Sequence, residues 1–193
     1  MPLNPLSFSE MKSELKKLIQ ERALEFKEVT LSSGKKSHYY LDCRKVTLNP
    51  QGLYLASRLI FQKLKEEGTF PEALGGPILG AVPLTAGLIL VSQMEKQPLM
   101  GFLVRKEPKS HGTKVWVEGA QSIPKGGNVA IIEDVITSAG SCIHAIEKVK
   151  ETGLNVIRVL CLVDREEGGS QKMAEMGYSL EPLFTAKELL GSA

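Results

Sequence analysis

Apolar positions recur with a helical period over most of the N-terminal third of the chain, and one stretch between the helices alternates instead. A capping-box pattern, S-x-x-E, begins at Ser7, and the apolar residues after it predict an amphipathic helix over residues 7–23. Residues 26–44 alternate as two short strands do, with a polar turn at residues 32–36. Helical spacing returns over residues 50–68, which begin with proline and end with glycine. We therefore expect two helices with a strand pair between them.

From residue 73 onward, short apolar segments alternate with amphipathic ones to the end of the chain. Strands are expected to end at residue 74 and to cover residues 100–104, 129–132 and 156–163. Helices are expected at about 84–93 and 141–153, followed by a helix, a strand and a capped helix at 185–190. A long polar loop is expected over residues 105–119. Because such alternation is typical of βαβ units, we predict an α/β fold with a mainly parallel central sheet flanked by helices.

Composition narrows the class of protein without identifying it. Hydrophobic residues make up 42% of the 193 residues, charged residues make up 24%, and the formal net charge is +2. These values are ordinary for a globular protein and give no general signature of nucleic-acid binding. No stretch approaches the roughly 18 apolar residues of a membrane span. The three cysteines lack C-x-x-C spacing, so we expect buried thiols in a reducing compartment and a cytoplasmic protein.

The densest chemistry lies in residues 129–141, which read V-A-I-I-E-D-V-I-T-S-A-G-S. The apolar start predicts a strand buried on both faces, and Glu133 and Asp134 are expected to emerge at its carboxyl end, where open α/β sheets bind ligands. The hydroxyl-rich loop that follows precedes a helix, with Ser141 as the expected N-cap. Amides at a helix N-terminus attract phosphate, and the two acids can accept hydrogen bonds from ribose hydroxyls. The alternative is a solvated strand end followed by an ordinary turn.

Residues 133–141 resemble the phosphoribosyl-diphosphate (PRPP) binding motif of the type I phosphoribosyltransferases. The resemblance implies that PRPP is bound by Glu133, Asp134, Val135, Ile136, Thr137, Ser138, Ala139, Gly140 and Ser141. It also implies a parallel sheet flanked by helices, a flexible catalytic loop and a small hood that binds the base. Ala139 stands where many members have glycine. Because alanine is strained at positive φ, either this backbone is right-handed or the loop binds phosphate less well.

A second motif, R-K-E-P-K-S-H-G at residues 105–112, concentrates cations in a segment too polar for a buried helix. Taken alone, it reads as a solvated charged segment. It is similar to the catalytic loop of the orotate phosphoribosyltransferases, a branch of the same family. Cations there meet the charge that develops on a leaving diphosphate. The resemblance implies that Arg105, Lys109 and His111 act in the active site of a partner subunit, whereas Lys106 acts in its own.

Residues 31–44, L-S-S-G-K-K-S-H-Y-Y-L-D-C-R, resemble the N-terminal element of the orotate branch. Tyr39 and Tyr40 there offer an aromatic surface to a flat pyrimidine, and packing within the hood core is the alternative for each. Ser32 stands where some members have a lysine that contacts substrate. This segment therefore adds a candidate site for the base.

Two further matches complete the expected site. Residues 75–83, G-G-P-I-L-G-A-V-P, resemble the loop whose backbone approaches pyrophosphate, with Leu79 where some members have lysine. Arg165, in L-V-D-R after a buried strand, matches the arginine that recognises the orotate carboxylate, and a surface salt bridge is the alternative. The expected orotate contacts are Thr137, Arg165, Tyr39 and Tyr40.

The resemblance implies a reaction of orotate with PRPP that gives orotidine 5′-monophosphate and pyrophosphate in pyrimidine biosynthesis. The expected catalytic residues are Arg105, Lys106, Lys109, His111 and Asp134. Mg²⁺ is the implied cofactor, held mainly by substrate and water rather than by protein ligands. We expect one domain over residues 1–193, with a core at about 50–165 and a hood made of residues 24–48 and the C-terminal segment. We also expect a homodimer whose loop acts in trans, without nucleic-acid or membrane partners.

Two other functions stay open at this point. One is a phosphoribosyltransferase for a different base, such as a purine or uracil, which the cationic loop and Arg165 disfavour. The other is a non-catalytic regulator that binds PRPP and nucleic acid, which the near-neutral charge disfavours. Turnover assays with different bases separate these alternatives.

Overall fold

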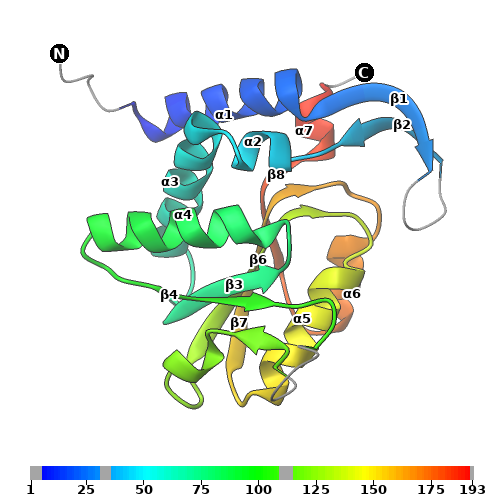
Figure 1. Ribbon diagram of the computed structural model, residues 1–193. Coiled ribbons are helices and arrows are strands. Elements are labelled where there is room, and N and C mark those ends of the chain that lie inside the picture. Colours follow the sequence, from blue (N-terminus) through cyan, green and yellow to red (C-terminus); the bar gives the residue numbers. More distant parts are fainter. Residues whose placement is uncertain (1–5, 31–35, 109–114, 192–193) are drawn as a thin grey trace.

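A six-stranded sheet forms the centre of the protein in a computed structural model that describes residues 6–30, 36–108 and 115–191 (Figure 1). In spatial order its strands are β5 (Val117–Glu118), β4 (Met100–Val104), β3 (Ala73–Pro77), β6 (Asn128–Ile136), β7 (Asn155–Asp164) and β8 (Leu180–Thr185). Neighbouring strands are parallel except for the antiparallel pair of β4 and β5. The predicted α/β fold with a mainly parallel sheet is confirmed.

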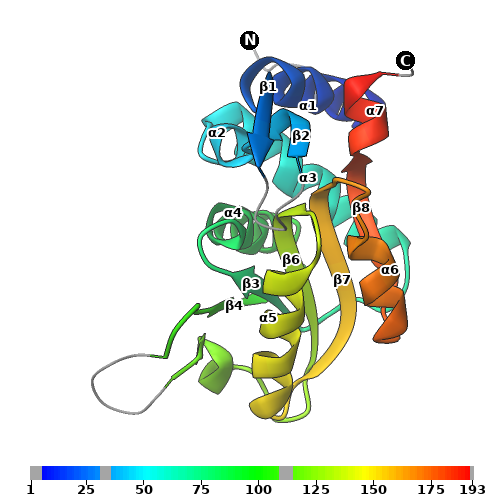
Figure 2. The same ribbon diagram turned by 90° about the vertical axis from the view of Figure 1, so that its right-hand side faces the viewer.

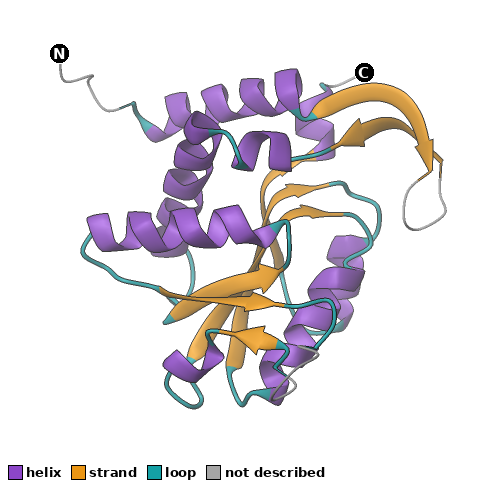
Figure 3. Cartoon of the chain, in the orientation of Figure 1, coloured by secondary structure: helices purple, strands orange, loops and turns teal. Residues whose placement is uncertain are grey.

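Helices cover both faces of this sheet (Figure 3). One face carries α3 (Pro50–Glu66) and α4 (Ala81–Met94), and the other carries α5 (Gly140–Glu151), with α6 (Gly169–Glu175) beside β8. Alternate residues of β6 enter the two cores: Ala130 and Ile132 join the core with α3 and α4, whereas Val129 and Ile131 join the core with α5. A strand covered on both faces is apolar throughout, which is why its sequence shows no polar alternation.

The hood lies at the carboxyl ends of the parallel strands (Figure 2). It consists of α1 (Phe8–Arg22), the antiparallel pair β1 (Leu24–Thr30) and β2 (Lys36–Leu41), α2 (Arg44–Thr47) and the C-terminal α7 (Ala186–Leu190). The predicted capping box of α1 is present, because the hydroxyl and amide of Ser7 both pair with Glu10. Helices α1 and α7 contact each other, so the C-terminal helix belongs to the hood.

Several predicted boundaries are wrong. Strand β6 continues past Ile132 to Ile136, because its last residues pair with β7, and β3 continues past residue 74 to Pro77. Helix α5 begins at Gly140, which makes Ala139 its N-cap in place of Ser141. Helix α2, strand β5 and a 3₁₀ turn at Ala120–Ser122 were not predicted from the sequence. In the part of the chain that the structure describes, no helix has both the length and the apolar character to cross a membrane.

Candidate active site

A pocket of about 510 Å³ opens between the hood and the carboxyl edge of the sheet. It lies where β3 and β6 are neighbours, and from there the chain winds outward through α4 to β4 in one direction and through α5 to β7 in the other. This reversal of strand order leaves a crevice beyond the strand ends, which is the usual ligand site of open α/β sheets. The predicted site residues that line the pocket are Tyr40, Lys106, Glu133, Asp134, Val135, Thr137, Ser141 and Arg165.

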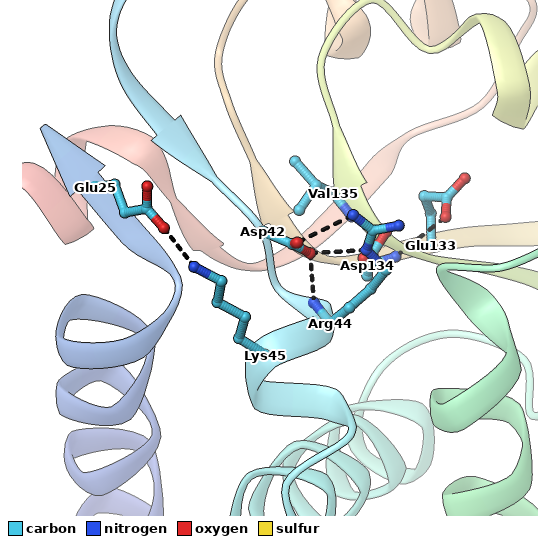
Figure 4. Close-up of polar contacts among 7 residues, drawn as sticks. All are labelled: Glu25, Asp42, Arg44, Lys45, Glu133, Asp134 and Val135. Atoms are coloured by element: carbon cyan, nitrogen blue, oxygen red, sulfur yellow. Dashed lines mark hydrogen bonds and ion pairs between the residues drawn. The ribbon is translucent and has the colours of Figure 1, made fainter. Parts of the chain in front are cut away.

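Glu133 and Asp134 form an acidic pair inside β6 rather than at its end. Glu133 is buried, and its carboxylate accepts hydrogen bonds from the Ser141 hydroxyl (3.2 Å) and the Asp134 amide (3.3 Å). Asp134 accepts a 2.8 Å hydrogen bond from the amide of Val135 (Figure 4). A Cβ at Gly80 would lie 2.2 Å from Asp134 Oδ1, so the turn after β3 passes directly over the pair. The acids are thus enclosed between two backbone segments.

The enclosure changes how the two acids ionise. Burial raises the pKa of Glu133 well above its ordinary value, and the neighbouring Asp134 charge raises it further. Burial also raises the pKa of Asp134. Two ionised carboxylates in such a site repel each other and lack hydration, so the pair favours a bound cation or a ligand that develops positive charge.

The loop after β6 has the geometry of an anion site. Ala139 has φ 63° and ψ 8°, a left-handed conformation, so the alternative of a right-handed backbone at this position is wrong. No side chain caps α5, whose first helical bond runs from the Ile143 amide to the Ala139 carbonyl (2.9 Å). The amides of residues 140–142 precede this bond and therefore have no helical partner. Uncapped amides at the positive end of a helix bind phosphate well.

Arg165 lies buried where β7 meets the hood. Its backbone amide pairs with the Ile136 carbonyl (2.9 Å), which fixes it beside the end of β6. The guanidinium lies 4.3 Å from the centre of the Tyr39 ring, and it donates to Glu167 (2.9 Å) and to the Ser37 hydroxyl (3.0 Å). The salt bridge considered above is present, to Glu167, but Arg165 is buried rather than at the surface. Arg165 presents a fixed, planar cation at the pocket wall, a form suited to a carboxylate.

The two tyrosines lie in different surroundings. Tyr40 lines the pocket, and the ammonium of Lys27 lies 4.8 Å from the centre of its ring. Tyr39 does not line it. The Tyr39 ring contacts the hood core and Arg165, and burial raises the pKa of its phenol.

Arg105 and Lys106 follow β4 at the same edge of the sheet. The Arg105 amide pairs with the Trp116 carbonyl (2.9 Å), and its guanidinium pairs with Glu118 (3.3 Å), so this cation is held at the stem of the loop. Lys106 lines the pocket, whereas Arg105 does not. The expected catalytic residues Lys109 and His111 lie outside the described residues.

The structure also brings together residues to which the sequence assigned no role. Asp42 and Arg44 line the pocket from the hood, and Ser37 orients Arg165. All three belong to residues 31–44, so the signal was present in that motif without a chemistry attached to it. Conversely, Ile136, Ser138, Ala139 and Gly140 belong to the predicted PRPP motif but do not line the pocket directly.

Among the described residues that line the pocket, the carboxylates are those of Glu133, Asp134 and Asp42. Across residues 6–30, 36–108 and 115–191, no group of three or more His, Cys, Asp or Glu side chains is arranged to hold a metal ion. A divalent cation here would need oxygen ligands from a substrate or water in addition to carboxylates.

Comparisons with known proteins agree with this geometry. Residues 45–182 match the family model described as phosphoribosyl transferase domain. An orotate phosphoribosyltransferase of Rhodopirellula baltica is 44% identical over 175 residues, which cover 89% of this chain and 90% of that protein. The orotate phosphoribosyltransferase of Mycobacterium tuberculosis, in complex with Fe(III) dicitrate, superposes with a TM-score of 0.79 at 29% identity and covers 93% of this chain and 98% of that chain. The same enzyme in complex with PRPP gives 0.76 at 27% identity, over 94% and 99% of the two chains.

Proposed function

This chain belongs to the orotate phosphoribosyltransferase family, and we propose that it transfers the 5-phosphoribosyl group of PRPP to orotate in pyrimidine biosynthesis. The products are orotidine 5′-monophosphate and pyrophosphate. One observation carries the proposal: a single pocket has the acidic pair of β6, the uncapped start of α5 and the buried Arg165 around it. These elements match the ribose, the phosphate and the carboxylate of the two substrates.

We propose that the 5′-phosphate of PRPP binds the amides at the start of α5 and the hydroxyls of Thr137 and Ser141. The absence of a side-chain cap on α5 supports this role. Glu133 and Asp134 accept hydrogen bonds from the ribose hydroxyls. Orotate then lies toward the hood, where Arg165 meets its carboxylate and Tyr40 borders its ring.

In the reaction, N1 of orotate gives up its proton to water and forms a bond to C1 of the ribose while the bond from C1 to the diphosphate oxygen breaks. The bonding electron pair leaves with pyrophosphate, so the ribose carries transient positive charge. The acidic pair favours that charge because it lies buried and close beneath the ribose. Lys106 meets the charge that develops on the leaving group.

Family members use a divalent metal ion with PRPP, and we propose Mg²⁺ here. When bound, Mg²⁺ disperses charge on the diphosphate oxygens. The acidic pair fits such an ion as an outer partner, because its two carboxylates lie at the pocket wall and neither forms a salt bridge within the described ranges of the chain. Substrate and water would supply most of the ligands.

We propose a homodimer in which Arg105, Lys109 and His111 act in the partner's site and Lys106 in its own. An apolar stripe along α4 supports this assembly: Ala86, Ile89, Leu90 and Met94 are exposed, and Val82 and Pro83 are half-buried. It starts beside a mainly apolar hollow of about 490 Å³ that shares Asp42, Arg44 and Leu79 with the active pocket. A second copy seated there would lie next to the active site. The unpaired, buried cysteines 43, 142 and 161 support a cytoplasmic location.

The proposed reaction is tested by following PRPP-dependent loss of orotate with and without Mg²⁺, with adenine, hypoxanthine and uracil as controls. We expect turnover of orotate alone, in step with pyrophosphate release, and loss of turnover when the metal is chelated. Turnover of another base instead of orotate, or tight and salt-sensitive nucleic-acid binding without turnover, would contradict the proposal.

The shared site is tested by mixing a Lys109→Ala variant with an Asp134→Asn variant, each of low activity alone. Hybrid dimers that combine one intact loop with one intact acidic pair should recover activity as the two are mixed. If no mixing ratio restores activity although hybrids form, the loop does not act in trans.

A further inference from the structure

An arginine of the hood stands at the edge of the active pocket without an assigned role. Arg44 begins α2, directly after the chain leaves β2. Asp42 forms a bidentate salt bridge with it: Arg44 Nε donates to Oδ1 (2.8 Å) and Nη2 donates to Oδ2 (3.0 Å), as Figure 4 shows. Asp42 is itself anchored, because its amide pairs with the Ala23 carbonyl (3.0 Å) and its carboxylate also accepts the Arg44 amide (3.1 Å). The direction of the guanidinium is therefore fixed by the fold.

This fork leaves donors over. A guanidinium has five N–H groups, and Asp42 occupies two of them. The remaining N–H groups, those of Nη1 and one of Nη2, have no hydrogen-bond partner within the described ranges of the chain. Arg44 lines the same pocket as Lys106, Glu133 and Asp134. Its unused donors thus border the space that a polyanionic substrate would fill.

The electrostatic surroundings agree with this position. Burial raises the pKa of Asp134, and the positive charge of Arg44 opposes that rise. The hydrogen bond from Arg44 in turn lowers the pKa of Asp42. Arg44 therefore acts on the acidic pair across the pocket as well as on its own partner.

Neighbouring residues indicate which part of the ligand Arg44 meets. Arg44 and Leu79 line both the active pocket and the adjoining apolar hollow, so Arg44 lies on the side of the turn after β3. The proposed 5′-phosphate site, at the start of α5, comes after the acidic pair in the chain, beyond the end of β6. Leu79 is 66% exposed and apolar, so it offers no charge to a diphosphate on this side. Among the described residues that line the pocket here, Arg44 and Lys106 carry that charge.

A purely structural role explains less. An exposed ion pair between near neighbours contributes about 0–1 kcal/mol to stability and requires no pocket beside it. Lys45, the next residue, shows what such a pair looks like: it bonds Glu25 on the far side of α2 and does not line the active pocket (Figure 4). Adjacent cations of one helix thus face different surroundings.

We propose that Arg44, held by Asp42, is a substrate-binding residue that contacts the diphosphate of PRPP and the departing pyrophosphate. This inference rests on the proposed function and adds a cation from the hood to the leaving-group site. Its planar fork offers two parallel donors to phosphate oxygens, which lysine cannot do.

The test compares Arg44→Ala with Lys45→Ala, which removes the same charge one residue away. For Arg44→Ala we expect the KM for PRPP and the inhibition constant of pyrophosphate to rise about tenfold, the effect of losing a charge-assisted contact, with the KM for orotate changed less than about twofold. Lys45→Ala should change all three less than about twofold. Gel filtration and thermal unfolding of every variant report whether fold and assembly are retained. Arg44→Gln, which keeps the length and a hydrogen bond to Asp42, serves if the alanine variant does not fold.

Unchanged PRPP and pyrophosphate constants in a folded Arg44 variant would overturn the proposal, and so would an equal rise in the orotate KM. Calorimetric titration of PRPP and of pyrophosphate separates this outcome from failure of the proposed function. If the wild type does not consume orotate, the function fails. Weaker PRPP binding by the Arg44 variant alone would still support the contact.

Discussion

One buried arginine lies near the start of strand β7 and another directly follows its end, and the two have opposite surroundings. Arg158 and Arg165 are each only 5% exposed. Arg158 is fully used by the protein: all three guanidinium nitrogens donate, to the Glu181 carboxylate and to the carbonyls of residues 63, 64 and 67 at the end of α3. Arg165 donates from Nε to Glu167 and from Nη2 to Ser37, and its Nη1 has no hydrogen-bond partner in the described parts of the chain.

The number of unused hydrogen-bond donors therefore distinguishes a structural arginine from a candidate ligand-binding one, whereas the exposed fraction does not. A buried cation is stable when its donors are satisfied, as at Arg158, which joins the end of α3 to β8. Donors left over beside a pocket indicate that a ligand supplies the missing acceptor. Arg165 meets this condition, and it lies at the carboxyl end of the strand, where ligands of α/β sheets bind.

The largest effect is expected from Arg158→Ala. The substitution leaves the Glu181 carboxylate and the α3 carbonyls without their donor, so the free energy of unfolding should fall by about 3–5 kcal/mol. Urea denaturation measures this loss. The double variant Arg158→Met with Glu181→Met removes both charges and should recover much of the stability. A loss below about 1 kcal/mol in the single variant would show that the network is not structural.

Arg165→Ala should show the reverse pattern. The KM for orotate is expected to rise about 10- to 100-fold, because a charge-assisted pair with the substrate carboxylate is lost. The KM for PRPP should change less than about twofold, and the loss of stability should be smaller than for Arg158→Ala. Steady-state kinetics with each substrate varied in turn measures the effect. A parallel rise in both KM values would indicate a general disturbance of the pocket.

Glu133 extends the comparison to a buried carboxyl group. Burial and Asp134 raise its pKa, so the folded state holds its proton more tightly than the unfolded state does. The contribution of Glu133 to the free energy of unfolding is therefore fully present below the ordinary glutamate pKa, and it is lost as the pH rises through the raised pKa. Glu133→Gln removes this loss and should be more stable than the wild type at pH 8, with the difference vanishing near pH 4. Unfolding curves across this range give the answer, and a variant less stable at pH 8 would contradict it.

The smallest effect is expected at Ala139. An alanine at φ 63° is strained by about 1–2 kcal/mol, which glycine avoids at the cost of a more flexible unfolded chain. Ala139→Gly should therefore raise the free energy of unfolding by about 0.5 kcal/mol, and it should lower the KM for PRPP by less than about twofold, because a left-handed alanine is expected to weaken phosphate binding. Ala139→Val, which cannot adopt this conformation easily, is the matched control and should destabilise the protein.

The sequence was sufficient for features that depend on local pattern. Apolar periodicity identified the parallel sheet, and the S-x-x-E pattern identified the capping box at Ser7. The sequence did not predict boundaries that depend on a partner far away in the chain. The acids were expected to emerge at the carboxyl end of the strand, because the apolar run ends at Ile132, but pairing of Val135 and Ile136 with β7 carries β6 beyond them. Ser141 has the preferred residue type for an N-cap, yet its hydroxyl bonds Glu133 and the left-handed Ala139 occupies that position.

The arginines illustrate the same limit. Arg165 was identified because its short motif carries a family signature, whereas nothing local distinguishes Arg158, whose carbonyl partners lie 91 to 95 residues away. Arg44 lies in a recognised motif, but its place beside Asp134 depends on how the hood meets the sheet. Sequence motifs thus named candidates, and only the fold shows which donors remain unused.

The role proposed for Arg165 is tested most directly by the base selectivity of the enzyme. Uracil lacks the carboxylate of orotate but keeps the pyrimidine ring, so the ratio of kcat/KM for orotate to that for uracil isolates the carboxylate contact. We predict a high ratio in the wild type and a fall of at least about tenfold in Arg165→Ala, with no such fall in a folded Arg158 variant. An unchanged ratio in Arg165→Ala would contradict the claim that the unused donors of this arginine recognise the substrate.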